Sequence, residues 1–483
     1  MSDLSGPASS NGAATGIGPA SSNGAETDSD PDFSSKPVLL SGWGRTTPAL
    51  CDLVSTGSAE GVARAVTDVG ERGIIARGLG RAYGDCAQNA GGSVLDGPKL
   101  RGVIDVDLAN GIVRAHAGTS LDDLMKWFVP LGLFVPVTPG TRSVTVGGAI
   151  AADIHGKNHH AKGSWGNHVV SFRLLDGHGA IRDVSPITDP GLFWATMGGM
   201  GLTGIVLDAT IKMSPIESAY LMVDTDRTNN LDEVMTLMVE GDEFYEYSVA
   251  WIDLIAKGRN MGRSILERGH FATEAEVTSR GKHDPHKYST HQLVSPPDVL
   301  PSGLLNHLTI RAFNEVWYRK SPKKRRDHLA TIEGFFHPLD MIDDWNRMYG
   351  PRGFLQWQTV LPDSATDVLR VAVERLSNSG ASSFLAVLKR FGPGNQGHLS
   401  FPAKGWTLAL DIPVSPELHG LLDELDEMIV EAGGRIYLAK DSRVRPELIP
   451  VMYPRLDEWR EIRDKVDPDR KFRSDMSRRL NLI

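Results

Sequence analysis

Three glycine-rich runs in the first half of the chain constrain its fold more than any other feature. They cover residues 76–85 (ARGLGRAYGD), 138–160 (TPGTRSVTVGGAIAADIHGKNHH) and 195–204 (ATMGGMGLTG). A backbone can approach a bulky, phosphorylated ligand closely only where side chains are absent, and glycine permits this. Three such runs in one region predict a large cofactor that lies along several loops.

The composition is that of a globular protein and excludes some classes of partner. The 483 residues are enough for two or three domains, and the 41% hydrophobic and 23% charged residues are ordinary fractions. A net charge of −9 argues against nucleic acid, which usually needs a basic surface. Cys51 and Cys86 provide no disulfide framework. We see neither a membrane-spanning run nor a signal-peptide pattern, so we expect a cytoplasmic protein with at most peripheral membrane contact.

The pattern along the chain predicts an α+β fold after a disordered tail at 1–36, in which GPASSNGA occurs twice. Ser58 is placed to cap a helix that ends near Gly70, and Ser120 and Asp123 form a capping-box pattern. Between them, residues 103–116 alternate around Asn110-Gly111, which predicts a hairpin. Mixed hairpins and strand–helix units indicate an α+β domain.

The first glycine run is not a dinucleotide-binding fingerprint of the Rossmann type. Gly78, Gly80 and Gly84 have a spacing that misses that fingerprint by one position, and no apolar-periodic helix follows to receive a pyrophosphate. A simple turn and a backbone amide nest that binds pyrophosphate both remain open.

Several blocks resemble the vanillyl-alcohol-oxidase-like FAD family. They include RGLGRAYGD, PGTRSVTVGGAIAADIHGKNHH and FWATMGGMGLTGI, and IHGKNHH and YLAKDSR are similar to its decaprenylphosphoryl-β-D-ribose 2′-epimerase branch. The resemblance implies a two-part FAD-binding domain of the PCMH type at 37–216 and 435–483. It also implies a substrate-binding domain with an antiparallel sheet at 217–434.

The resemblance further implies the reaction and its partners. The expected activity is FAD-dependent oxidation of the 2′-hydroxyl of a polyprenylphosphoryl ribose, after which a separate NAD(P)H-dependent reductase completes the epimerisation. Flavoproteins of this branch are also described on the periplasmic side of the membrane. Two alternatives remain: an alditol or aldonolactone oxidase that produces peroxide, and a lipid-carrier binding protein with a purely structural flavin.

Two positions depart from the family. Many relatives carry, in the first glycine loop, a histidine that bonds covalently to the flavin, whereas this chain has Arg81, so we expect non-covalent FAD. The epimerase branch often has a cysteine within GWxxCxD that covalent inhibitors attack; here Ala409 stands at that place. Hydride transfer needs no thiol, so Ala409 is compatible with activity.

Lys440, Tyr83 and His155 are the catalytic candidates. Lys440 ends the expected strand RIYLA between the domains and matches a functional lysine of the family, although it could instead be a surface lysine paired with Asp441. Tyr83 could orient the sugar or pack under its loop. His155 resembles the family histidine beside the flavin ring, although it could instead be a structural histidine. A metal site through His155, His159 and His160 lacks a partner at a recognised spacing, so we expect none.

The remaining site predictions follow from the resemblance. Gln356 is included with Gln358, although strand alternation would point it to the other face, and Thr407 stands where the family usually has asparagine. The predicted cofactor-binding residues are Arg77, Gly78, Leu79, Gly80, Arg81, Ala82, Tyr83, Gly140, Thr141, Thr145, Gly147, Gly148, Ala151, Asp153, Ile154, His155, Gly204, Ile205 and Tyr437. The predicted substrate-binding residues are Lys157, Trp251, Phe336, Gln356, Gln358, Lys389, Thr407 and Lys440.

The run YRKSPKKRRDH at 318–328 is the densest basic cluster. It could be a solvated loop, or it could attract anionic lipid headgroups and help the protein find a lipid substrate.

Overall fold

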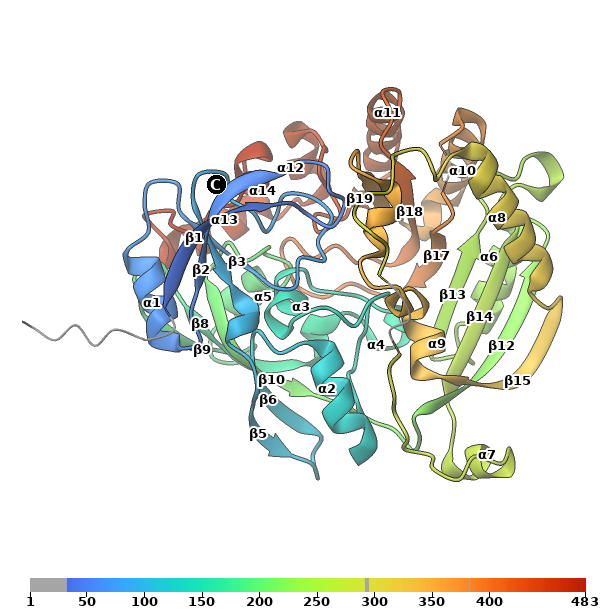
Figure 1. Cartoon of the computed structure of the whole chain (residues 1–483), viewed down its shortest axis with the longest axis horizontal. Helices are drawn as coiled ribbons and strands as arrows, with labels where there is room; N and C mark the ends of the chain where they lie inside the picture. The colour runs from blue at the N-terminus through green and yellow to red at the C-terminus, as the bar shows by residue number, and fades with distance from the viewer. Residues whose placement is uncertain (1–32, 292–294, 382) are drawn as a thin grey trace, which may run out of the picture.

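The computed structural model describes residues 33–291, 295–381 and 383–483. Strands up to Pro215 form three small sheets, and the eight later strands of the described residues form one sheet at the other end of the molecule (Figure 1). The predicted α+β class is confirmed. Most of the predicted tail lies outside the described residues, but β1 begins at Ser34 and pairs with β2, which is earlier than the predicted start at 37.

The N-terminal half is built on antiparallel pairs with one parallel unit. The hairpin predicted around Asn110-Gly111 is present, with Val106 opposite Val113. In sheet order, the strands are β1 (Ser34–Leu40), β2 (Ala49–Ser55), β4 (Ser93–Asp96) and β3 (Ile74–Arg77); β5 (Val103–Asp107), β6 (Ile112–His116), β10 (Ile205–Lys212), β8 (Val169–Leu175) and β9 (Ile181–Val184); and β11 (Ser214–Pro215) with β7 (Leu133–Phe134).

Side chains that cap helices fix where several of them begin. Ser58 accepts from Gly61 N ahead of α1, and Ser120 and Asp123 form the predicted capping box of α2. The helices of this half are α1 (Ala59–Thr67), α2 (Leu121–Phe128), α3 (Val146–Ala151), α4 (His159–Lys162) and α5 (Pro190–Thr196).

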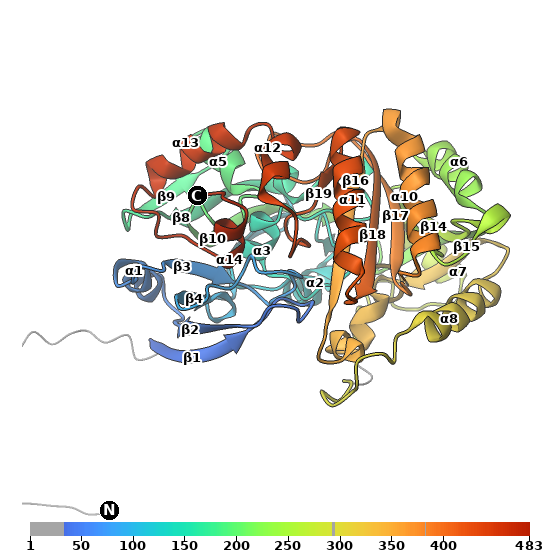
Figure 2. The same cartoon turned by 90° about the horizontal axis from the view of Figure 1, so that it is seen from above.

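The eight-stranded sheet is antiparallel and has two different faces. Alternation along its strands sends Leu388, Leu408 and Leu410 toward the helices that cover one face, whereas Lys389 and Ala409 line a cavity on the other. In Figure 2, α6, α10 and α11 lie along the covered face. The strand order is β15 (Lys324–Thr331), β12 (Tyr220–Thr228), β14 (Ser264–Phe271), β13 (Tyr247–Ile252), β17 (Ala386–Phe391), β18 (Gly405–Pro413), β16 (Phe354–Leu361) and β19 (Arg435–Ile436).

Helices of the second half connect and cover these strands. They are α6 (Leu231–Gly241), α7 (Glu274–Ser279), α8 (His307–Lys320), α9 (Ile332–Phe336), α10 (Thr366–Ser379), α11 (Leu418–Glu431), α12 (Ile449–Met452), α13 (Leu456–Val466) and α14 (Asp475–Arg479). Within the described ranges, no helix has both the length and the apolar character needed to cross a bilayer.

The C-terminal segment joins the two halves. The expected strand 435–439 is shorter than predicted: β19 pairs with β16 and ends at Ile436, and residues 438–440 form a turn. The chain then returns to the N-terminal half, where Arg479 forms an ion pair with Asp85 at 2.7 Å and Phe472 bridges to Ile74. The domain boundaries themselves stay a prediction.

Candidate active site

A cavity of about 1100 Å³ lies between the glycine-rich loops and the open face of the eight-stranded sheet. Residues 76–83, 138–145 and 204–206 line one side, and side chains of β13, β16 and β17 line the other. Pockets for small ligands typically measure roughly 300–1,000 Å³. This cavity can therefore hold a large cofactor together with a substrate.

Lys440 stands at the wall of this cavity, at the end of the turn that follows β19. Its Nζ lies 4.2 Å from the centre of the Tyr83 ring, and the Lys440 backbone N–H donates to the Tyr437 carbonyl at 2.9 Å. Burial lowers the pKa of the Lys440 ammonium group, and the nearby negative charge of Asp411 opposes that effect. Lys440 is thus a half-buried amine in contact with the first glycine loop, and Asp441 forms its ion pair with Arg479 at 2.9 Å instead.

A buried polar network lies behind Lys440 and Tyr83. The Gln356 amide nitrogen donates to Tyr83 Oη at 3.0 Å and to Asp411 Oδ1 at 2.5 Å. Asp411 Oδ2 is buried and has no hydrogen-bond partner within the described part of the chain. Burial raises the pKa of the Asp411 carboxyl group to about 7. Asp411 is a functional candidate that sequence reasoning missed, and its position two residues after Ala409 on β18 was the available signal.

His155 is buried and neutral. Burial, together with the charges of Lys389 and Lys440, holds its pKa well below the usual range. Its Nε2 accepts from the Gln358 amide nitrogen at 2.9 Å, so the ring carries its proton on Nδ1. No described residue is hydrogen-bonded to Nδ1. A buried donor without a partner at a cavity wall is suited to a ligand acceptor.

Two further lysines, Lys157 and Lys389, line the cavity. Lys157 donates to the Phe335 carbonyl, and burial lowers its pKa to about 8. Burial and repulsion from the other two lysines lower the pKa of Lys389 to about 7. Three amino groups near one another favour an anionic ligand, because such a ligand would relieve their repulsion.

Comparisons with known proteins agree with this geometry. Residues 53–185 match the family model of the FAD binding domain, and residues 411–480 match the model of D-arabinono-1,4-lactone oxidase. A decaprenylphosphoryl-beta-D-ribose oxidase from Mycolicibacterium smegmatis is 49% identical over 460 residues, which cover 94% of this chain and 100% of that protein. The chain belongs to the decaprenylphosphoryl-β-D-ribose oxidase family. L-gulonolactone oxidase 3 from Arabidopsis thaliana is a more distant relative, 20% identical over 81% of this chain and 74% of its own.

The cavity fits the FAD that this oxidase family binds. The space around a Cβ at Gly140 is open, and Gly80 has a φ of +67°, so the two loops present bare backbone to the cavity. Tyr437 lies at the wall with its hydroxyl donating to the Ala152 carbonyl at 2.8 Å. The predicted cofactor-binding residues that line the cavity are Arg77, Gly78, Leu79, Gly80, Arg81, Ala82, Tyr83, Gly140, Thr141, Thr145, Gly147, Gly148, Ala151, Ile154, His155, Gly204, Ile205 and Tyr437.

Two predicted site residues lie behind the wall instead. Asp153 is fully buried and already accepts from Ser164, Ser400 and Gly166 N, so its carboxylate holds loops together and does not face a ligand. Thr407 is buried and accepts from Gln358 at 3.3 Å, which makes it a support for Gln358. Both corrections have the same cause. Side chains or backbone from other segments already form hydrogen bonds with the polar atoms of Asp153 and Thr407, so these atoms do not face the cavity.

Gln356 lines the cavity as predicted, and only the alternation argument against it is wrong. It lines the cavity together with Gln358, because residues two apart on a strand share a face. The predicted substrate residues Lys157, Trp251, Phe336, Gln358, Lys389 and Lys440 also line the cavity. Ala409 does so as well, so a small methyl group faces the cavity at this position.

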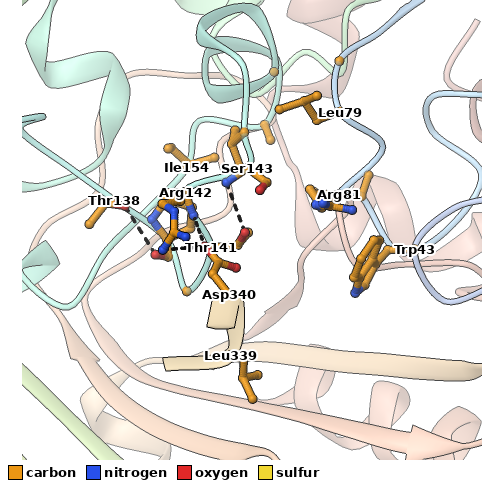
Figure 3. Close-up of a pocket in the computed structure, with 18 of the residues that line it drawn as sticks. Trp43, Leu79, Arg81, Thr138, Thr141, Arg142, Ser143, Ile154, Leu339 and Asp340 are labelled. Atoms are coloured by element: carbon orange, nitrogen blue, oxygen red, sulfur yellow. Dashed lines mark hydrogen bonds and ion pairs between the residues drawn. The ribbon is translucent and has the colours of Figure 1, made fainter. Parts of the chain in front are cut away.

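The first and second glycine loops are fixed by contacts that the sequence did not reveal (Figure 3). The Arg81 guanidinium lies over the Trp43 ring, 3.9 Å from its centre. The Arg142 backbone N–H donates to Asp340 Oδ2 at 2.7 Å, and its side chain forms an ion pair with Asp122 at 2.9 Å. The segment around Asp340 therefore closes one side of the cavity. In the part of the chain that the structure describes, no group of three His, Cys, Asp or Glu side chains is arranged to hold a metal ion.

Proposed function

We propose that this protein oxidises the 2′-hydroxyl of decaprenylphosphoryl-β-D-ribose to a ketone. This is the first half of an epimerisation that yields the arabinose donor for cell-wall arabinan. Membership of the oxidase family supports the proposal, and the observation that carries it is the half-buried Lys440 ammonium over Tyr83 at the cavity wall. Bound FAD supplies the acceptor for the hydride that leaves the hydroxyl-bearing carbon.

Lys440 is the proposed proton acceptor. Burial lowers its pKa, which enlarges the fraction of neutral amine near neutral pH. The neutral amine accepts the hydroxyl proton and becomes an ammonium ion, which the negative charge of Asp411 stabilises. Tyr83 orients the sugar, and His155 offers its Nδ1 proton to a ligand acceptor atom.

Lys157 and Lys389 are the proposed cations for the substrate phosphate. The Lys389 ammonium group forms no hydrogen bond with another described residue, and its pKa is lowered by the other two lysines. A phosphate placed between them would restore the charged form of Lys389. Trp251 of β13 and Phe336 of α9 give the cavity apolar walls.

Substitution of Lys440 tests this assignment. We expect the Lys440→Ala protein to retain FAD and to reduce it roughly 100- to 10,000-fold more slowly than the native protein, which is the usual contribution of a general base. Stopped-flow absorbance of the flavin after anaerobic mixing with substrate measures the rate. Lys404→Ala, at an exposed lysine ahead of β18, is the matched control. A Lys440→Ala protein with full FAD and normal turnover would show that the role is wrong.

An aldonolactone or alditol oxidase that produces peroxide is the second candidate. The match of residues 411–480 to D-arabinono-1,4-lactone oxidase favours it. Rapid peroxide formation with free polyols would support this candidate.

We further propose that the protein works with a separate NAD(P)H-dependent reductase subunit that completes the epimerisation. The oxidation leaves the flavin reduced, and a separate electron acceptor reoxidises it for the next turnover. The released ketone then needs a hydride from another donor, which NAD(P)H supplies. We also propose peripheral contact with the plasma membrane, because the substrate carries a long polyprenyl tail.

A further inference from the structure

Helix α8 presents its apolar residues to the outside of the molecule. Its buried residues are Ile310 and Asn314, and Asn314 donates to Asp253 Oδ1 at 2.8 Å. Leu308 and Val316, in contrast, are 75% and 66% exposed. A helix on a protein core normally buries its apolar residues, so α8 has the reverse arrangement.

Polar contacts hold α8 in place. The Arg227 guanidinium donates to the carbonyls of Tyr318 and Ser321 at the end of the helix, at 3.2 and 3.3 Å. Glu315 forms an ion pair with Arg263 at 2.6 Å. The apolar face is therefore not needed to attach the helix to the rest of the protein.

Lys320, Lys323, Lys324 and Arg325 lie where α8 ends and β15 begins, and they are called the basic turn below. All four side chains are exposed, and none of them takes part in an ion pair among the described residues. Their neighbour Arg326 differs, because it pairs with Asp226 at 2.6 Å. The chain as a whole carries a net charge of −9, so the basic turn is a local positive surface on an acidic protein. Such a surface is complementary to anionic headgroups.

The cavity reaches this same face. Phe313 and Trp317 of α8 line it with their rings stacked at 6.1 Å, and Pro322 and Arg325 line it next to them. Figures 1 and 2 both place α8 and β15 at the end of the molecule away from the sheet of β1–β4. A ligand tail that leaves the cavity between α8 and β15 would emerge on the apolar and basic face.

We propose that α8 and the basic turn dock onto an anionic membrane surface and hold the mouth of the cavity against the lipid. The inference rests on the proposed function, in which the substrate carries a polyprenyl tail. Helices that lie in a membrane interface combine Trp, Phe and Leu on one face with a border of Lys and Arg. A membrane fits this face better than a protein partner does, because the opening for the lipid tail lies on it.

Sedimentation of the FAD-loaded full chain with vesicles tests the proposal. We expect the native protein to sediment with vesicles of phosphatidylcholine and phosphatidylglycerol in equal parts, and less with phosphatidylcholine alone. Charge reversal by Lys320→Glu, Lys323→Glu and Lys324→Glu together should weaken binding at least about tenfold. The pair Leu308→Asp and Val316→Asp should also weaken it, because it removes apolar contact with the interface. Flavin absorbance and melting temperature should match the native protein, since these side chains are exposed.

Matched substitutions elsewhere separate the surface from overall charge. Lys36→Glu, Lys99→Glu and Lys404→Glu together change the net charge equally at exposed lysines, and Leu39→Asp replaces a leucine that is 66% exposed on β1. These controls should bind vesicles as the native protein does. Equal losses in both triple variants would overturn the proposal, and so would a native protein that stays in the supernatant. Loss of reductase binding with unchanged vesicle binding would assign the face to a protein partner and would also overturn it.

Activity in detergent micelles separates a failure of the membrane-docking proposal from a failure of the proposed oxidase function. Micelles deliver the lipid-linked sugar without a bilayer, so the α8 variants should reduce their flavin at the native rate there. If even the native protein fails to reduce flavin in micelles, the proposed function is wrong, whatever the vesicle result.

Discussion

Buried charges set the chemistry of the site at the scale of single residues. Lys157, Lys389 and Lys440 all have lowered pKa values, whereas the Asp411 carboxyl has a raised one. Burial is the first cause in each case, because it disfavours the charged form of either kind of group. The cavity can therefore exchange protons with a ligand near neutral pH.

Replacement of Asp411 should shift the pH dependence of the reaction. The Asp411 charge raises the pKa of Lys440, so Asp411→Asn lowers that pKa further. If neutral Lys440 is the base, activity rises with pH as the amine loses its proton. We therefore expect the rising limb of kcat/KM to move about one pH unit lower in the variant. Because Lys440 and Asp411 are coupled, the midpoint of this limb reflects the titration of the pair. The difference in midpoint between the native protein and the variant measures the interaction between the two groups.

A purely structural Asp411 would give another result. The variant would lose FAD or stability, and the midpoint of its limb would coincide with that of the native protein. Flavin content and melting temperature, measured on the same preparations, distinguish the two roles.

The residues at the flavin site also predict how the cofactor is attached. Arg81, not a histidine, stands in the first glycine loop, and its guanidinium is stacked on Trp43. Cys86 lines the cavity, but burial raises the pKa of its thiol to about 12, which leaves little reactive thiolate. We expect acid precipitation to release the yellow chromophore into the supernatant. Colour that stays with the pellet would contradict non-covalent binding.

At the scale of elements, the site forms where two loops approach without intervening side chains. The Tyr83 N–H donates to the Ala439 carbonyl at 3.1 Å, which joins the first glycine loop to the turn that carries Lys440. A Cβ at Gly84 would lie 1.9 Å from the Asp441 carbonyl oxygen. Glycine is required here because the two backbones are in contact.

Gly84→Ala should therefore separate the two loops. We expect a lower melting temperature and weaker FAD retention, because the added methyl group overlaps backbone that cannot move alone. Gly70→Ala is the matched control, since no atom lies within 4 Å of a Cβ there. Thermal unfolding followed by flavin fluorescence compares the variants. Identical melting and FAD content in the two would contradict the close approach.

The sequence predicts elements whose signals are local and misses those that depend on packing. Ser58, Ser120 and the Asn110-Gly111 turn determine their own neighbourhoods through bonds within a few residues, and these elements formed as predicted. The sequence predicts a strand up to Lys440, but β19 ends at Ile436 although its partner β16 continues alongside. The N–H groups of Lys440 and Asp441 both donate to the Tyr437 carbonyl, so the chain turns there.

The same distinction holds for the candidate site. The glycine runs mark the flavin side because close approach to a ligand requires glycine itself. No local sequence pattern points to Asp411, because only the pairing of β16 with β18 brings it opposite Gln356. Asp153 illustrates the opposite error: it lies in the right run, but its carboxylate is used by Ser164 and Ser400.

At the scale of the whole molecule, one cavity connects three parts of the fold: the side for the cofactor, the side for the sugar and phosphate, and the outer end for the lipid tail. The glycine loops line its cofactor side, the sheet supplies Gln358 and Lys389, and α8 and β15 border its outer end. The turn at 438–440 brings Lys440 between the first two parts. This arrangement accounts for a lipid-linked sugar as substrate, because the cavity offers a place for the sugar and phosphate and a way out for the tail.

Anaerobic flavin reduction tests that account most directly. Purified, FAD-loaded protein is mixed without oxygen with polyprenylphosphoryl ribose in micelles, and in parallel with free ribose, free polyols and aldonolactones. We predict rapid loss of the oxidised flavin absorbance with the lipid-linked ribose and none with the free compounds. Bleaching by free polyols or lactones alone, or by none of these compounds, would contradict the account.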